Sequence, residues 1–442
     1  MNITSRGWTV RLGGTLEAVG ADRRTALLLL GVVVVATSAF AMRYYDGQDF
    51  VYNVWAPIRG LLAGHNPYDP SDAEYFGQYQ VPVVAGLYAP TALLVHAPLA
   101  LLSQSRSADA MAVLNAALIW LGVLLLIPPR TAHSYFGAAA AGALVVLSAP
   151  AEITIKLGQL SGLAFAGLAL LVASLRKDPS ATWLPAIGAT FVALKPQSMI
   201  PIFIALGVLG CRKVLLRAAT ILAVTSLPGA VLFIRAAGNP MAILRTIGEN
   251  LDLLSRLPPG DLANPRNLRI DALGLVSHLG GPALIGLGWN LVILLVTTGL
   301  LVLAVRACDQ DARTLADPYV ATLVTLYVVA SLYHLTYDQL LFYVGPLAAF
   351  GILTESNAGS RSSRVIASGG VALIGAGLVL RSGFCARMVH YGLPSLTVHK
   401  AWVTSPMLIV VALVGCAFAL GRRPNSRAGE LHRQNRRDEI EG

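Results

Sequence analysis

Residues 25–52 read TALLLLGVVVVATSAFAMRYYDGQDFVY, and this stretch decides the fold class of the chain. Its first part, residues 25–42, carries no charge and is long enough to cross a bilayer as one helix. The polar lead before it is long and no small-residue cleavage site follows it, which predicts a retained helix rather than a removed signal. Two acids, Asp46 and Asp49, come directly after this helix, and in a chain with few acids their placement calls for a reason.

The composition extends the membrane interpretation to the whole chain. Of the 442 residues, 55% are hydrophobic and only 13% are charged, with a mean hydropathy of +0.65, whereas soluble domains are about 25% charged. We therefore predict an all-α polytopic protein whose first partner is the lipid bilayer. The net charge of +10 does not indicate a nucleic-acid partner, because Lys and Arg lie between apolar runs and in the tail from Arg422, without an aromatic-interleaved basic patch.

Thirteen apolar runs are candidates for membrane spans. They are 25–42, 89–102, 108–127, 135–150, 158–175, 181–195, 197–211, 214–235, 283–305, 319–334, 339–354, 363–381 and 405–421. Basic residues place both termini in the cytoplasm, so the number of crossings must be even. We predict about 12 transmembrane helices, with the short, proline-broken run 89–102 lying re-entrant or at the interface; the alternative is that 135–150 or one run within 181–211 does not span.

This topology divides the chain into a cytoplasmic segment 1–24, a transmembrane domain 25–421 and a basic cytoplasmic tail 422–442 that we expect to be disordered. The long outer loops are 43–88 and 236–282. Polar elements that are not basic topology signals all fall on the outer face in this arrangement. The absence of a clear internal repeat weighs against a transporter, whose halves often show one.

Several short motifs on the predicted outer face occur in the order of a known family. They are Asp49-Phe50-Val51-Tyr52 with Gly64-His65-Asn66-Pro67-Tyr68-Asp69, then Gly158-Gln159, Leu194-Lys195-Pro196-Gln197 and His334-Leu335-Thr336-Tyr337-Asp338. In these motifs the chain resembles glycosyltransferase family 87, the polyprenyl-phosphate-mannose-dependent mannosyltransferases of the GT-C superfamily. Two departures, Tyr88-Ala89-Pro90 for a Pro-Pro pair and residues 264–269 for an Asn-Gln-Ser motif, concern the donor and acceptor more than the fold.

The resemblance implies a GT-C-like fold with a long first extracytoplasmic loop, in a multi-pass protein of the cytoplasmic (inner) membrane with an extracytoplasmic active site. It implies transfer of a sugar, mannose first among them, from a polyprenyl-phosphate donor to a glycolipid or glycan acceptor. No cofactor and no metal are expected. Two other functions stay open from the sequence: a lipid-linked sugar flippase or other transporter, and a non-catalytic membrane scaffold.

Asp49 is the candidate general base. The resemblance places the family's catalytic aspartate at this position, and the neighbouring aromatic residues can partly desolvate its carboxylate. Asp46 is the nearest rival for the catalytic role. The alternative to both is that the two acids only solvate a helix end.

The remaining candidates are expected to bind substrate: Lys195, Gln159, His334, Asp338, Gln197, Tyr52, Arg266 and Arg269. Lys195 lies beside a helix-breaking proline in an apolar setting, where a lysine is costly, so it is the first candidate for the donor phosphate; a snorkelling lysine is the alternative. His334 and Asp338 are four residues apart and would share a helix face, either to hold the donor or to join helices. Gln159 would bind sugar hydroxyls or cap a helix, and Arg266 and Arg269 would clamp phosphate.

Overall fold

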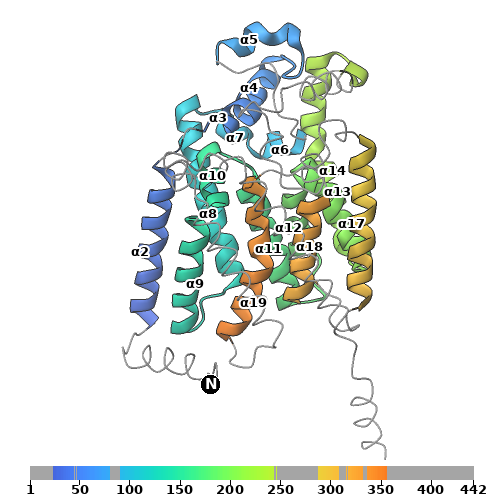
Figure 1. The fold of residues 1–442 in the computed structure, drawn as a ribbon. Coiled ribbons are helices and arrows are strands. Elements are labelled where there is room, and N and C mark those ends of the chain that lie inside the picture. The colour runs from blue at the N-terminus through green and yellow to red at the C-terminus, as the bar shows by residue number, and fades with distance from the viewer. Residues whose placement is uncertain are drawn as a thin grey trace, which may run out of the picture.

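The structure, a computed structural model, describes residues 23–43, 45, 47–79, 90–242, 245, 287–307, 315, 317–331 and 336–355. Within these residues the chain is helical and has no strand, and it forms a bundle of upright helices with a cap of short helices at one end (Figure 1). The bundle helices are α2 (Arg23–Met42), α8 (Gln104–Leu126), α9 (Ala132–Val146), α11 (Ser161–Lys177), α12 (Trp183–Ala193), α13 (Pro196–Val208), α14 (Arg212–Ala237), α17 (Leu287–Ala307), α18 (Pro318–Ser331) and α19 (Val344–Glu355). The all-α prediction is confirmed for the described part of the chain.

The length and apolar character of these helices make the chain a membrane protein. Among the described residues, α2, α8 and α14 are each long and apolar enough to cross a bilayer alone. Shorter apolar helices, α12 and α13 among them, complete the bundle. The predicted runs 363–381 and 405–421 lie outside the described residues, so the total of about 12 crossings stays a prediction.

One predicted span is bent. Helix α9 is followed by α10 (Ala149–Leu157), and the two meet at an angle of 64°. The break lies at the joint between them, where Ser148 has an extended backbone and Pro150 stands in the first turn of α10, a position that proline tolerates because a helix can start there but not continue through it. Helix α10 therefore turns aside near the cap instead of extending α9.

The cap is built from the first outer loop and the run that follows it. Its elements are α3 (Gln48–Phe50), the π-helix η1 (Val51–Trp55), α4 (Ala56–Ala63), the 3-10 helix η2 (Pro70–Asp72), α5 (Ala73–Gly77), α6 (Pro90–Val95) and α7 (Ala97–Ala100). With six and four residues, α6 and α7 are too short to span, in agreement with the expectation for 89–102. Phe50, Trp55 and Leu93 form a core for the cap that is separate from that of the bundle.

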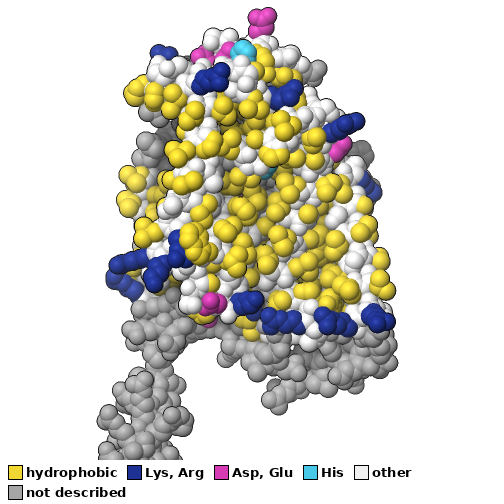
Figure 2. Space-filling view, turned by 180° about the vertical axis from the view of Figure 1, so that it is seen from behind, with side chains coloured by type: hydrophobic (Ala, Val, Ile, Leu, Met, Phe, Trp, Pro, Cys, Tyr) yellow, Lys and Arg dark blue, Asp and Glu magenta, His cyan; other side chains and the backbone are white. Residues whose placement is uncertain are grey.

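The surface shows the polarity expected of a membrane protein. Figure 2 shows, on the face turned to the viewer, a broad band of apolar side chains across the middle of the molecule and a row of Lys and Arg along the lower edge of the described part. Arg23 and Arg24 open α2, Lys177 ends α11, and Arg212 and Lys213 open α14, at the helix ends away from the cap. Large apolar residues remain exposed on α2 and α14, which suits contact with lipid tails.

Helix α11 occupies the middle of the bundle. It packs against both α8 and α12, and its buried residues lie on all of its faces. A helix that is apolar all round is typical of such a central position. The first residue of α11, Ser161, is buried and lies at the end of the helix nearest the cap. The core therefore fixes the end of α11 that faces the cap.

Candidate active site

The corner between α10 and α11 is the centre of the candidate site. Helix α10 ends at Gly158, whose φ of +70° places it in the left-handed region that favours glycine. A Cβ at this position would also lie 2.5 Å from the Cβ of Phe50, the residue after Asp49. The Gly158-Gln159 motif therefore allows the corner to turn and lets the first outer loop approach it closely.

The first outer loop is tied to this corner through its backbone. The Gly47 N–H donates to the Lys156 carbonyl over 3.0 Å, and the Val51 N–H donates to the Gly47 carbonyl over 3.0 Å. Residues 48–63 then continue helically through α3, η1 and α4. Asp49 lies in the first turn of this stretch, where the helix dipole stabilises a negative charge.

The Asp49 carboxylate is half-buried and is held by two amide side chains. The Gln159 Nε2 group donates to Asp49 Oδ2, and the Asn53 Nδ2 group donates to Asp49 Oδ1 over 3.3 Å. Gln159 is only 2% exposed, so it is held firmly by the protein around it. Amide donors of this kind orient a carboxylate, which can then accept a proton as a general base.

A second cluster joins three parts of the chain on the other side of the corner. Lys195, which precedes α13, forms an ion pair with Asp338 of the 3-10 helix η6 (Thr336–Tyr343). The Lys195 ammonium also donates to Ser161 Oγ over 2.9 Å, and the Ser161 hydroxyl donates to Asp338 Oδ1 over 2.7 Å. Lys195 is 1% exposed, while Ser161 and Asp338 are fully buried. We call these three residues the ion-pair cluster.

The two clusters share one short piece of backbone. Gln159 contacts Asp49, and Ser161, two residues later, contacts both Lys195 and Asp338. The start of α11 therefore connects the amide-held carboxylate at the cap with a buried ion pair in the bundle.

The structure brings together Asp49, Gln159, Lys195 and Asp338 from the residues predicted to form the site. Tyr52 packs half-buried against the cap core, and Gln197 is half-buried in the first turn of α13. Asp46, Arg266, Arg269 and His334 lie outside the described residues. The expected pairing of His334 with Asp338 therefore stays a prediction, while Lys195 is a partner of Asp338 that the sequence analysis did not assign.

Two further site residues were not predicted. Asn53 follows Asp49 by four residues, a helical spacing that could have indicated it. Ser161 carries no signal in the sequence, because its partners Lys195 and Asp338 are distant along the chain.

The motif at residues 64–69 has a structural role in the cap. Gly64 ends α4 with a φ of +89°, and the following His65 Nδ1 lies 2.8 Å from Asp72 Oδ1. Tyr68 is buried and stacks on Phe233 of α14, with ring centroids 5.4 Å apart, and this burial raises the pKa of its hydroxyl. Backbone and hydroxyl bonds from Ser71 lower the pKa of Asp69. The motif thus attaches the cap to α14 and does not contact Asp49 through any of these bonds.

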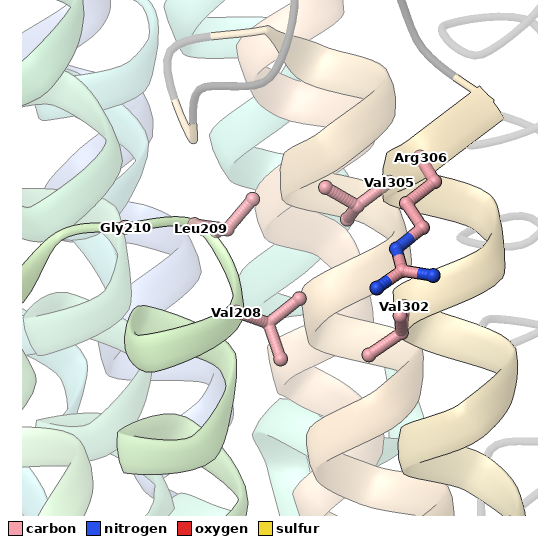
Figure 3. A pocket seen from close by; sticks show the side chains of 6 residues that line it. All are labelled: Val208, Leu209, Gly210, Val302, Val305 and Arg306. Atoms are coloured by element: carbon pink, nitrogen blue, oxygen red, sulfur yellow. The ribbon is translucent and has the colours of Figure 1, made fainter.

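A pocket lies away from this site, at the other end of α13. It encloses about 430 Å³, and Val208, Leu209 and Gly210 face Val302, Val305 and Arg306 of α17 across it (Figure 3). None of the predicted site residues that the structure describes lines it. Among the described residues, no group of three or more His, Cys, Asp or Glu side chains is placed to hold a metal ion.

Comparison with known proteins identifies the family. The model of glycosyltransferase family 87 matches residues 87–333, more than half of the chain. Comparisons with curated proteins and with solved structures give no match. The matched region includes Gln159, Ser161 and Lys195, whereas Asp49 and Asp338 lie on either side of it. The chain therefore belongs to glycosyltransferase family 87, and it is a membrane glycosyltransferase.

Proposed function

We propose that this protein transfers a sugar, mannose first among the candidates, from a polyprenyl-phosphate donor to a hydroxyl of a glycolipid or glycan, with Asp49 as the general base. The observation that carries this proposal is the half-buried Asp49 carboxylate, held by Gln159 and Asn53 where the cap meets the bundle. A base at this place can meet an acceptor approaching from the aqueous side while the donor's lipid tail stays in the bilayer.

The proposed step is a single displacement at the anomeric carbon, with inversion. As the acceptor oxygen attacks, its proton passes to Asp49, and a new C–O bond forms. The bond from the anomeric carbon to the phosphate oxygen breaks, and polyprenyl phosphate leaves with the electron pair. Because negative charge grows on the leaving phosphate, cationic or hydrogen-bonding groups close to it would lower the barrier.

Lys195 remains the first candidate for the phosphate, and the structure sets a condition on this role. Its ammonium is 1% exposed and already bonds Ser161 and Asp338. A donor phosphate would have to compete with a buried carboxylate for it, and a carboxylate left without its cation is costly in that setting. Arg266 and Arg269 are the other candidates for the same role.

We place this site on the extracytoplasmic face of the cytoplasmic membrane, with both termini in the cytoplasm. The support is the distribution of charge: the basic helix ends carrying Arg23, Lys177 and Lys213 lie away from the cap that carries Asp49. Labelling of single cysteines introduced into the cap and at the start of α14, with a reagent that does not cross the membrane, tests the orientation. Labelling of the cap cysteine alone in intact cells is expected, and labelling of the α14 cysteine alone would contradict it.

Purified protein in lipid nanodiscs tests the base. The probes are radiolabelled polyprenyl-phosphate mannose as donor and a lipid extract of the native envelope as acceptor. We expect Asp49→Asn to lower transfer by about 10²- to 10⁴-fold, the usual contribution of general base catalysis, with an unchanged unfolding temperature. Asp69→Asn is the matched control, because Asp69 is another cap acid but bonds Ser71.

Near-normal transfer by Asp49→Asn would exclude Asp49 as the base. The same preparation separates the other two functions considered. Movement of the donor between leaflets without a new glycosidic bond would favour a flippase, and neither activity, with an unaltered glycolipid profile in a deletion strain, would favour a scaffold.

A further inference from the structure

The backbone at the start of α11 reaches both the proposed base and the ion-pair cluster. Gln159 donates to Asp49, and its own N–H donates to the Thr154 carbonyl of α10 over 3.0 Å. Ser161 follows as the first residue of α11. Between α10 and this turn stands Gly158 in the left-handed conformation, so the orientation of Gln159 depends on how firmly both sides of the corner are held.

The Ser161 hydroxyl holds the α11 side of the corner. The Lys195–Asp338 ion pair by itself joins the segment before α13 to η6. Ser161 adds α11 to this pair, because its hydroxyl accepts from Lys195 over 2.9 Å and donates to Asp338 over 2.7 Å. Both partners carry a charge, and hydrogen bonds to charged groups are among the stronger ones.

We propose that Ser161 is a positioning residue for sugar transfer: it anchors the first turn of α11 to the Lys195–Asp338 pair and thereby holds the Gln159 amide on the Asp49 carboxylate. The inference rests on the proposed role of Asp49 as the base. A displacement of about 1 Å at a catalytic group can lower a rate by as much as about 100-fold. Loss of the buried Ser161 hydroxyl, two residues from Gln159, is therefore expected to lower the rate of sugar transfer, although the hydroxyl itself does not act on the substrate.

The experiment is a double-mutant cycle in the nanodisc transfer assay with radiolabelled polyprenyl-phosphate mannose. Ser161→Ala keeps the Lys195–Asp338 pair and removes only the link to α11. We expect kcat to fall about tenfold, with the donor KM within about twofold of wild type, since positioning of the base affects the transition state more than binding. The acid limb of the pH–rate profile is expected to move to higher pH, because Asp49 loses part of its support as a carboxylate.

The second arm of the cycle is Gln159→Leu. If Ser161 acts through Gln159, Ser161→Ala in the Gln159→Leu background is expected to lower kcat by less than about twofold, because the two effects are not additive. Ser161→Thr keeps the hydroxyl and is expected to restore at least about half of kcat. Ser174→Ala is the matched control, since Ser174 is a buried serine of the same helix that bonds only its own helix carbonyls in the contacts seen, Leu170 and Leu171.

Three outcomes would overturn the proposal: a kcat for Ser161→Ala equal to that of Ser174→Ala, full additivity with Gln159→Leu, or a loss confined to the donor KM. If Ser161→Ala does not fold, Ser161→Cys, which keeps the volume but bonds weakly, carries the same test. An active Asp49→Asn would remove the proposed base, whereas an inactive Asp49→Asn with an unaffected Ser161→Ala would remove only the positioning role.

Discussion

Asp49 and Asp338 are two aspartates that the same corner of the chain holds in opposite ways. Asp49 is half-buried at the cap and accepts from the amides of Gln159 and Asn53. Asp338 is fully buried in the bundle and accepts from the ammonium of Lys195 and the hydroxyl of Ser161. The contacts of Asp49 therefore include two neutral amides at a half-buried position, whereas those of Asp338 include a cation at a fully buried one.

This difference separates a group suited to chemistry from one suited to structure. A carboxylate paired with a buried ammonium is held strongly in its charged form and is a poor base. The carboxylate that accepts from the two amides is partly exposed, which leaves a path for an acceptor hydroxyl to reach it. We therefore expect loss of one charge of the Lys195–Asp338 pair to act mainly on stability, and changes at Gln159 or Asn53 to act mainly on rate. Ser161, which joins the pair to the turn that carries Gln159, is expected to act on rate.

The largest expected effect comes from breaking the ion pair on one side. Lys195→Met leaves the Asp338 carboxylate buried without its cation, which costs about 3–5 kcal/mol. The double variant Lys195→Met/Asp338→Leu removes both charges and is expected to recover most of that loss. Titration with a denaturing detergent, with unfolding as the readout, measures the stability of the single and of the double variant. Equal losses in the single and double variants would show that the charge pairing contributes nothing specific.

A smaller effect, on rate rather than stability, is expected at the other aspartate. Gln159→Leu removes a hydrogen bond to a charged group, worth about 1.5–3 kcal/mol, or about 10- to 150-fold in kcat/KM if it is fully expressed in the transition state. Asn53→Leu is the matched variant and is expected to cost less, because its bond to Asp49 is 3.3 Å long. The pH–rate profiles of both variants check this order. A larger loss of stability than of rate in Gln159→Leu would contradict the division between the two clusters.

The smallest effect concerns the cap core beside Asp49. His96 is 1% exposed, its Nδ1 donates to the Ala92 carbonyl over 2.8 Å, and burial lowers its pKa. A histidine with a lowered folded-state pKa binds protons more readily when unfolded, so stability is full above the unfolded pKa of about 6.5 and declines as the pH falls below it. We expect the free energy of unfolding to decline between pH 7.5 and pH 5.5.

Unfolding temperatures of the wild type and of His96→Gln between pH 5.5 and 7.5 measure this effect. The glutamine can keep a hydrogen bond to Ala92 but takes up no proton. The difference between wild type and variant in the slope of unfolding temperature against pH therefore gives the contribution of His96 alone. Identical slopes would show that the cap core does not respond to pH through this residue.

Much of the fold followed from the sequence because lipid imposes a simple rule. Apolar runs such as 25–42, 108–127 and 214–235 became helices within a few residues of their expected ends. Prolines and basic residues indicated that 89–102 would not cross as one helix. The bend between α9 and α10 was missed, because hydrophobicity along the run 135–150 does not record a local break at Ser148 and Pro150.

The site followed from the sequence only in part. Asp49, Gln159, Lys195 and Asp338 were selected from composition, position and family resemblance, which identify unusual polar residues but not their partners. Lys195 was expected to meet a phosphate, and Asp338 was expected to pair with His334. The structure pairs Lys195 with Asp338, 143 positions apart, through a serine that no local pattern marks.

The sequence by itself determined that this chain is a helical membrane protein, because the free energy of placing uncharged runs in lipid depends on local composition alone. It also carried the motifs of glycosyltransferase family 87. Only the tertiary structure decided how the two aspartates differ, since a carboxylate's charge and basicity depend on the atoms packed around it. Those atoms come from Gln159 and Asn53 for Asp49, and from Lys195 and Ser161 for Asp338, and packing of distant segments brought them together.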